Sequence, residues 1–138
     1  MPSRLFVDAA AWIALADSDD QYHQVTAQAF AGLSEQRVNL VTTNLVVAES
    51  YTWIRHRLHH RAAVAFLDRL SGAQRLERVL STAELEEVAE SILHQYADQD
   101  LSYTDAVSFA VMRERGIQEA FTFDRHFAAA GFTMVPGA

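Results

Sequence analysis

The chain has 138 residues, half of them hydrophobic, and a formal net charge of −7. This length favours one domain with an adequate core. The lack of cysteine excludes disulfides, thiolate metal sites and thiol catalysis, and it fits a reducing compartment. Because a globally acidic protein does not hold polyanions by general electrostatics, a nucleic-acid substrate would require bound metal ions or a local basic patch.

Short apolar runs alternate with longer segments of helical periodicity. In chain order, we expect a strand at residues 4–8, helices at 10–16 and 21–33, a strand at 38–42, helices at 45–58 and 61–70, a strand at 76–80, helices at 82–96 and 105–115, a strand at 120–123, a helix at 125–129 and a strand at 132–135. Such alternation is typical of a parallel sheet. The predicted fold is α/β: one domain over residues 1–138, with about five parallel strands and helices on both faces.

Capping residues mark several helix boundaries. Asn44 precedes an apolar helical run and is expected to be its N-cap. The segment 81–84 has the spacing of a capping box, and the segment 102–105 has a related spacing with Asp in place of Glu. Gly116 is expected to end the helix that begins near Asp105.

Membrane and export signals are missing from the sequence. No apolar run is long enough to cross a membrane. The amino-terminal segment is interrupted by Asp8 and lacks the basic start and long apolar stretch of a signal peptide. We therefore expect a soluble, cytoplasmic protein.

Four carboxylates lie far apart in the chain, each in or beside an apolar run: Asp8, Glu49, Asp105 and Asp124. An ionised carboxylate is costly to bury unless a cation pairs with it. Ligands of parallel α/β sheets bind beyond the carboxyl ends of the strands, where Asp8 and Asp124 are expected. The four together predict a shared divalent ion, and all-oxygen ligands favour Mg²⁺ or Mn²⁺ over zinc.

Each acid also has a simpler structural interpretation. Asp8 and Asp124 could cap the helices that follow them, and Asp105 suits the first turn of a helix. Glu49 lies inside a helix and caps nothing, so a salt bridge to an arginine is its alternative. The four taken jointly favour the metal site.

The ordered set of motifs resembles the PIN-domain ribonucleases, in particular the VapC toxins of VapBC toxin–antitoxin pairs. The resemblance rests on FVD in the first strand, a glutamate in the helix after the second strand, LSYTDA and TFDRHF, and it covers essentially the whole chain. It implies a metal-dependent endoribonuclease, with Asp8, Glu49, Asp105 and Asp124 as catalytic ligands of one or two Mg²⁺ or Mn²⁺ ions. It also implies hydrolysis of RNA by a metal-activated water, a VapB-like antitoxin and a homodimer.

One position departs from the family pattern. The family commonly has a small hydroxyl residue just after the first aspartate, whereas Ala9 and Ala10 follow Asp8 here. The hydrogen bond of that hydroxyl is therefore missing or comes from elsewhere. Histidine is not needed as a general base in the implied mechanism, and His126, close to Asp124, is the only histidine of interest.

Three further residues are candidates for supporting roles. Asp100, with Asp98 nearby, could supply another carboxylate, although both suit a polar loop. Thr104 and Thr122 lie beside motif acids and could orient water or metal, although such threonines more often pack or cap.

The segment RHRLHHR, residues 55–61, is the one basic cluster in the sequence. Arg55, Arg57 and Arg61 could contact RNA phosphates. Alternatively, the cations simply suit the carboxyl end of the preceding helix. The two interpretations stay open.

Apolar helix faces around Trp12, Phe30, Trp53 and Leu67 could form core, a dimer surface or a groove for an antitoxin, and core is expected for each.

The alternative function is a catalytically inactive PIN-like module that binds RNA or protein. Receiver domains and haloacid-type phosphatases are poor matches because both use a lysine and this chain has none.

Overall fold

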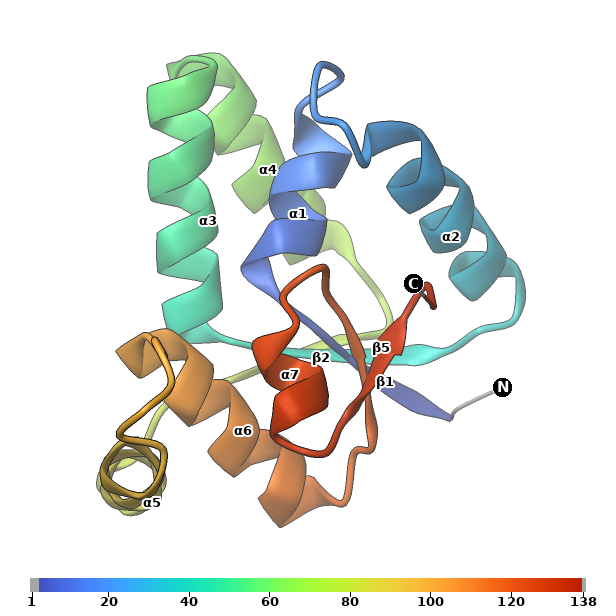
Figure 1. Ribbon diagram of the computed structural model, residues 1–138. Coiled ribbons are helices and arrows are strands. Elements are labelled where there is room, and N and C mark those ends of the chain that lie inside the picture. Colours follow the sequence, from blue (N-terminus) through green and yellow to red (C-terminus); the bar gives the residue numbers. More distant parts are fainter. Residues whose placement is uncertain (1–2, 138) are drawn as a thin grey trace.

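The computed structural model describes residues 3–137 and shows an α/β fold with helices on both faces of a sheet (Figure 1). The sheet has the order β3-β2-β1-β4-β5, and all neighbouring strands are parallel. The predicted fold class is therefore confirmed. The strands are β1 (Arg4–Val7), β2 (Asn39–Thr43), β3 (Leu76–Val79), β4 (Glu119–Phe121) and β5 (Thr133–Val135).

Seven helices connect and cover these strands within residues 3–137. In the view of Figure 1, α1, α2 and α4 lie above the sheet, and α5 and α6 lie below it. None of the helices in this range is long and apolar enough to span a membrane. The helices are α1 (Ala9–Ala16), α2 (His23–Glu35), α3 (Asn44–Arg57), α4 (His60–Gly72), α5 (Ala83–Gln95), α6 (Tyr103–Arg115) and α7 (His126–Ala129).

All the predicted strands and helices are present, with ends that differ by one or two residues. The central strand β1 carries the most apolar run, and Leu5, Phe6 and Val7 are fully buried. The edge strand β3 differs, because Glu77 and Arg78 are exposed. Continuous apolar sequence therefore identifies the inner strands, which are covered on both faces. The prediction of one domain over 1–138 includes residues 1, 2 and 138, which lie outside the described part.

Two predicted caps are wrong by one residue. The N-cap of α3 is Thr43, whose hydroxyl accepts a 3.1 Å hydrogen bond from the Val46 N–H. Asn44 instead accepts a 2.9 Å hydrogen bond from the Ser81 N–H, which joins the loops after β2 and β3. The N-cap of α5 is Thr82, not Ser81, so the predicted capping box at 81–84 does not form. In both cases two adjacent side chains can cap, and the one that does not cap makes another hydrogen bond: Asn44 accepts from the Ser81 N–H, and the Ser81 hydroxyl donates to Glu86.

The other two boundary predictions are confirmed. Ser102 and Asp105 form a reciprocal capping box at the start of α6, with hydrogen bonds of 3.0 and 3.2 Å. Gly116 ends α6 in the left-handed conformation, at φ 65°, which favours glycine.

The expectation of core for the apolar helix faces fails at Trp53. Trp12 is buried and its ring lies 5.3 Å from that of Phe30 and 6.0 Å from that of Phe66. Trp53 is 51% exposed on α3, and the guanidinium of Arg57 lies 5.7 Å from its ring centre. The side of α3 that carries Trp53 therefore faces solvent and not the sheet.

Candidate active site

The four predicted carboxylates converge at the carboxyl edge of the sheet. Asp8 follows β1 and Asp124 follows shortly after β4, and these strands are parallel neighbours. Glu49 comes from α3 and Asp105 from the first turn of α6. Asp8 is repelled by Asp105 and Glu49, and both of these are repelled by Asp124, so the acids act on one another electrostatically.

Asp8 is the most buried acid of the cluster, with 5% of its surface exposed. Burial, and secondly repulsion from Asp105, raises its pKa to about 7. It occupies the N-cap position of α1, but its side chain makes no capping hydrogen bond. Asp8 is therefore the N-cap of α1 by position but makes no side-chain capping bond, and its carboxylate interacts instead with the Ala9 N–H, the Thr122 hydroxyl and the other acids.

Thr122 supplies the hydroxyl that Ala9 and Ala10 cannot. Its Oγ1 donates a 2.9 Å hydrogen bond to Asp8 Oδ2 and accepts a 3.0 Å hydrogen bond from the Asp124 N–H. The side chain is fully buried. One threonine therefore fixes the carboxylate of Asp8 and the backbone of Asp124 relative to each other.

Thr122→Val is expected to lower the free energy of unfolding by about 1–3 kcal/mol, because it leaves a buried carboxylate oxygen and a backbone N–H without their partner. Urea unfolding measures this, and a Mn²⁺ titration should show weaker binding. Thr26→Val is the matched control, since the buried Thr26 hydroxyl has no hydrogen-bond partner within residues 3–137. Equal effects of the two substitutions would contradict a specific role for the Thr122 hydroxyl.

Glu49 is half-buried and makes no ion pair with an arginine in the part of the chain that the structure describes. The salt-bridge alternative is therefore wrong. Burial and then repulsion from Asp105 raise the pKa of Glu49, while the Thr104 side chain lowers it. Thr104 thus lies within reach of Glu49, a member of the cluster, which is compatible with the supporting role considered for it from the sequence.

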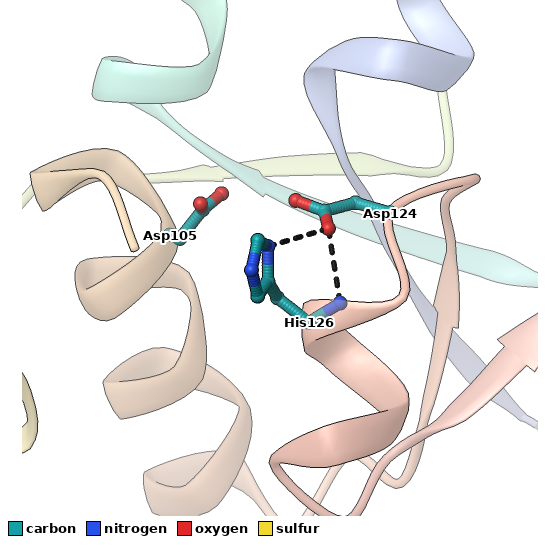
Figure 2. Close-up of side chains that lie close together, drawn as sticks. All are labelled: Asp105, Asp124 and His126. Carbon is teal, nitrogen blue, oxygen red and sulfur yellow. Dashed lines mark hydrogen bonds and ion pairs between the residues drawn. The ribbon is translucent and has the colours of Figure 1, made fainter. Parts of the chain in front are cut away.

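Asp105, Asp124 and His126 form a compact group, and each can offer a ligand atom within 4.8 Å of the others. Figure 2 shows the three side chains directed toward one another. His126 Nδ1 lies 2.8 Å from Asp124 Oδ1, and that oxygen also accepts a 2.9 Å hydrogen bond from the His126 N–H. The pKa of Asp105 is raised mainly by burial and lowered by its bonds to Ser102. Sequence reasoning gave His126 little weight, and its closeness to Asp124 was the only signal.

The structural interpretation of Asp105 holds alongside the functional one, whereas the prediction of Asp124 as a helix N-cap is wrong by one residue, because the N-cap of α7 is Arg125. Asp105 completes the capping box of α6 while its charge acts on the cluster. Asp124 accepts from a backbone amide of the turn into α7. Local hydrogen bonds therefore fix the position of both carboxylates.

Neither Asp98 nor Asp100 is among the charges that raise the pKa of Asp8, Glu49 or Asp105. Both are exposed, and neither makes an ion pair or a side-chain hydrogen bond within residues 3–137.

The arginines of the basic cluster at residues 55–61 differ in their ion pairs. Arg57 lies 3.8 Å from Asp17 and 3.6 Å from Asp20, so its charge is engaged by the loop after α1.

The residues present fit a hard divalent cation. No arginine of residues 3–137 makes an ion pair with any acid of the cluster, and His126 is the only partner that can carry positive charge. Burial and mutual repulsion raise the pKa of three of the acids. Carboxylate oxygens are the ligands that Mg²⁺ and Mn²⁺ prefer.

Comparison with known proteins agrees with this geometry. The PIN domain family matches residues 5–133. The chain belongs to the PIN domain family. Among PIN proteins it is 43% identical over 132 residues to the 23S rRNA-specific endonuclease VapC20 of Mycobacterium tuberculosis, strains CDC 1551 / Oshkosh and H37Rv, covering 95% of this chain and 97% of VapC20. The resemblance inferred from the motifs is confirmed.

One solved structure supports the same assignment, and a second one shares the fold. The crystal structure of M. tuberculosis VapC20, a sarcin–ricin loop cleaving toxin, matches with a TM-score of 0.86 and 36% identity over 94% of this chain and 96% of that one. PAE2754 of Pyrobaculum aerophilum matches with a TM-score of 0.62 and 22% identity over 96% of this chain and 89% of that one. The second match bears on the fold alone.

Proposed function

We propose that this PIN-domain protein is a metal-dependent endoribonuclease and the toxin of a toxin–antitoxin pair. The observation that carries the proposal is the convergence of Asp8, Glu49, Asp105 and Asp124 without an arginine to neutralise them within residues 3–137. The 43% identity to VapC20 supports it and suggests the substrate, the sarcin–ricin loop of 23S rRNA.

The four acids would hold one or two Mg²⁺ or Mn²⁺ ions, with His126 beside them. Such an ion supplies Lewis acidity at a phosphodiester and offsets the negative charge of the cluster. Asp8 must be deprotonated to act as a ligand, and with a pKa of about 7 it changes its protonation near neutral pH. Thr122 holds the Asp8 carboxylate in one orientation through its hydroxyl.

His126 fixes the orientation of Asp124. Since Asp124 Oδ1 already accepts from the His126 backbone amide, the imidazole Nδ1 at 2.8 Å is best placed to donate to the same oxygen. Two donors on one oxygen leave Asp124 Oδ2 as the atom free to face a cation. We therefore assign His126 a positioning role and not that of a general base.

RNA cleavage tests the proposed function. Purified protein is incubated with a hairpin of the sarcin–ricin sequence and with an unrelated hairpin, in Mg²⁺, in Mn²⁺ and in EDTA, beside Glu49→Gln. We expect cleavage that requires metal, prefers the first hairpin and is lost in the variant. Folded protein that binds both hairpins but cuts neither in metal would instead identify an inactive PIN-like binding module.

Arg55 and Arg61 are proposed to contact RNA phosphates, whereas Arg57 is engaged by Asp17 and Asp20. Arg55→Gln and Arg61→Gln are each expected to reduce the slope of log affinity against log salt by about 1. Arg57→Gln should leave that slope unchanged and cost about 0–1 kcal/mol of stability, as for exposed ion pairs. An unchanged slope for Arg55→Gln and Arg61→Gln would favour the alternative, in which the cations only suit the end of α3.

Two protein partners are proposed on the same grounds. The likeness to VapC20 suggests a VapB-like antitoxin that blocks the acidic site, and a homodimer. A ribosomal RNA substrate would also place the protein in the cytoplasm. Sedimentation of the purified protein tests the dimer, and inhibition of cleavage by the product of a short adjacent reading frame tests the antitoxin.

A further inference from the structure

A stacked aromatic pair includes the residue that precedes Asp124 in the chain. The Tyr22 ring, at the start of α2, stacks on the Phe123 ring with centroids 4.1 Å apart and planes 5° from parallel. Phe123 immediately precedes Asp124 in the chain. Tyr22 is nevertheless 39% exposed, so the stack does not simply complete the core.

Tyr22 and Phe123 line a cavity of about 240 Å³. Its remaining lining consists of apolar or small residues and one cation: Val25, Arg125, Met134, Pro136 and Gly137. Pockets for drug-sized ligands have about 300–1,000 Å³, so this smaller cavity suits one ring system. No acidic side chain of residues 3–137 lines it, although the protein carries a net charge of −7.

The cavity is held in place by local contacts. The Tyr22 N–H donates a 2.8 Å hydrogen bond to Asp20 Oδ1, which fixes the start of α2. The Phe123 ring packs on Phe121, at 6.2 Å between centroids. A preformed aromatic surface lowers the entropic cost of binding. Arg125 is exposed and makes no ion pair within residues 3–137, so its guanidinium can meet an anion.

We propose that Tyr22, Phe123 and Arg125 form a subsite for one unpaired base of the RNA substrate, next to the phosphate that is cleaved. The base stacks against the Tyr22–Phe123 pair, and Arg125 contacts the adjoining phosphate. Proteins recognise RNA loops largely through unstacked bases that lie on aromatic rings. Phe123 and Arg125 flank Asp124 in the chain, and this is the reason for placing the bound base close to the reacting phosphodiester. This inference rests on the proposed endoribonuclease function.

Combining variants of Tyr22 with hairpins that lack one base tests the subsite. Cleavage of a sarcin–ricin hairpin is compared with that of hairpins that each lack one loop base, for wild type, Tyr22→Ala and Tyr22→Phe. On the complete hairpin we expect Tyr22→Ala to lower kcat/KM by about 5- to 150-fold, the range for loss of one base stack, and Tyr22→Phe to have little effect. On the hairpin that lacks the bound base, Tyr22→Ala should cost almost nothing.

Controls separate this role from a structural one and from the proposed function itself. Mn²⁺ binding should be unchanged in Tyr22→Ala. If the alanine variant does not fold, Tyr22→Leu, which keeps an apolar contact with Phe123, is used in its place. Arg125→Gln should weaken binding of every hairpin and reduce the salt slope by about 1. If wild type binds the hairpins without cutting them, the proposed function fails, and the same comparison of Kd values still decides the subsite.

Three results would overturn the subsite. The first is an equal penalty for Tyr22→Ala on every hairpin, which marks a structural role. The second is no penalty on any hairpin, with inhibition by the antitoxin also unchanged. The third is unchanged RNA cleavage and binding together with weaker inhibition by the antitoxin, which would assign the cavity to a protein side chain.

Discussion

Asp8→Asn is expected to abolish RNA cleavage and at the same time to stabilise the metal-free protein. The ionised Asp8 carboxylate is 5% exposed, faces Asp105 and has no cationic partner within residues 3–137. Asparagine has the same shape, carries no charge, and can still accept the hydrogen bond from Thr122. The substitution therefore removes an unfavourable charge without opening a cavity.

The size of the stability effect follows from the pKa of Asp8, raised from 3.8 to about 7. With about 1.4 kcal/mol for each unit of difference, ionising Asp8 costs the folded, metal-free protein on the order of 4 kcal/mol at pH 8. Changes in residues that only support metal ligands already cost about 10–100-fold, so loss of a ligand should lower cleavage by about 10³-fold or more.

Urea unfolding at pH 8 in EDTA and RNA cleavage in Mn²⁺ measure the two effects. Asp68→Asn, which removes an exposed carboxylate from α4, is the matched control and should change neither. If Asp8→Asn instead destabilises the metal-free protein, the negative charge of Asp8 must be compensated by a contact other than those seen within residues 3–137. Full cleavage by Asp8→Asn would remove Asp8 from the catalytic set.

The metal-free protein is expected to lose stability as the pH rises from about 5 to 8. Asp8 has a folded pKa of about 7 and an ordinary value of 3.8, so between these values the folded state binds more protons than the unfolded state. Stability then falls with rising pH through this window, and the contribution of protonated Asp8 is lost above pH 7. Glu49 and Asp105, whose pKa values are also raised, act in the same direction.

Thermal unfolding across this pH range, in EDTA, measures the slope. Asp8→Asn should flatten it, because the residue with the largest change is gone. Bound metal should reverse it, since the acids bind a cation only when deprotonated, and the stabilisation by Mn²⁺ should increase from pH 6 to 8. Stability that instead rises with pH in EDTA would contradict the raised pKa of Asp8.

The convergence of the four acids could be predicted because it depends on topology. Parallel strands place their carboxyl ends on one edge of the sheet, so Asp8 and Asp124, which follow two strands, had to lie at that edge. Glu49 and Asp105 were recognisable because each lies in a helix with apolar neighbours. Apolar periodicity was also sufficient to predict the order of strands and helices.

Contacts between residues far apart in sequence could not be predicted in the same way. The hydrogen bond from Thr122 to Asp8 joins positions 114 residues apart, and nothing local in the sequence marks it. The stack of Tyr22 on Phe123 depends likewise on how α2 packs against the end of β4. Arg57 appeared available for RNA because the sequence did not show that Asp17 and Asp20 lie against it.

A calorimetric titration of Mn²⁺ at pH 8 tests most directly whether the four acids form a metal site. We expect saturable binding to the wild type that is lost in Glu49→Gln and in Asp105→Asn and is retained in Asp68→Asn. The heat should vary between buffers of different ionisation enthalpy near pH 7, because Asp8 releases its proton on binding. Equal Mn²⁺ binding by the wild type and both cluster variants, or no saturable binding at all, would contradict the metal site.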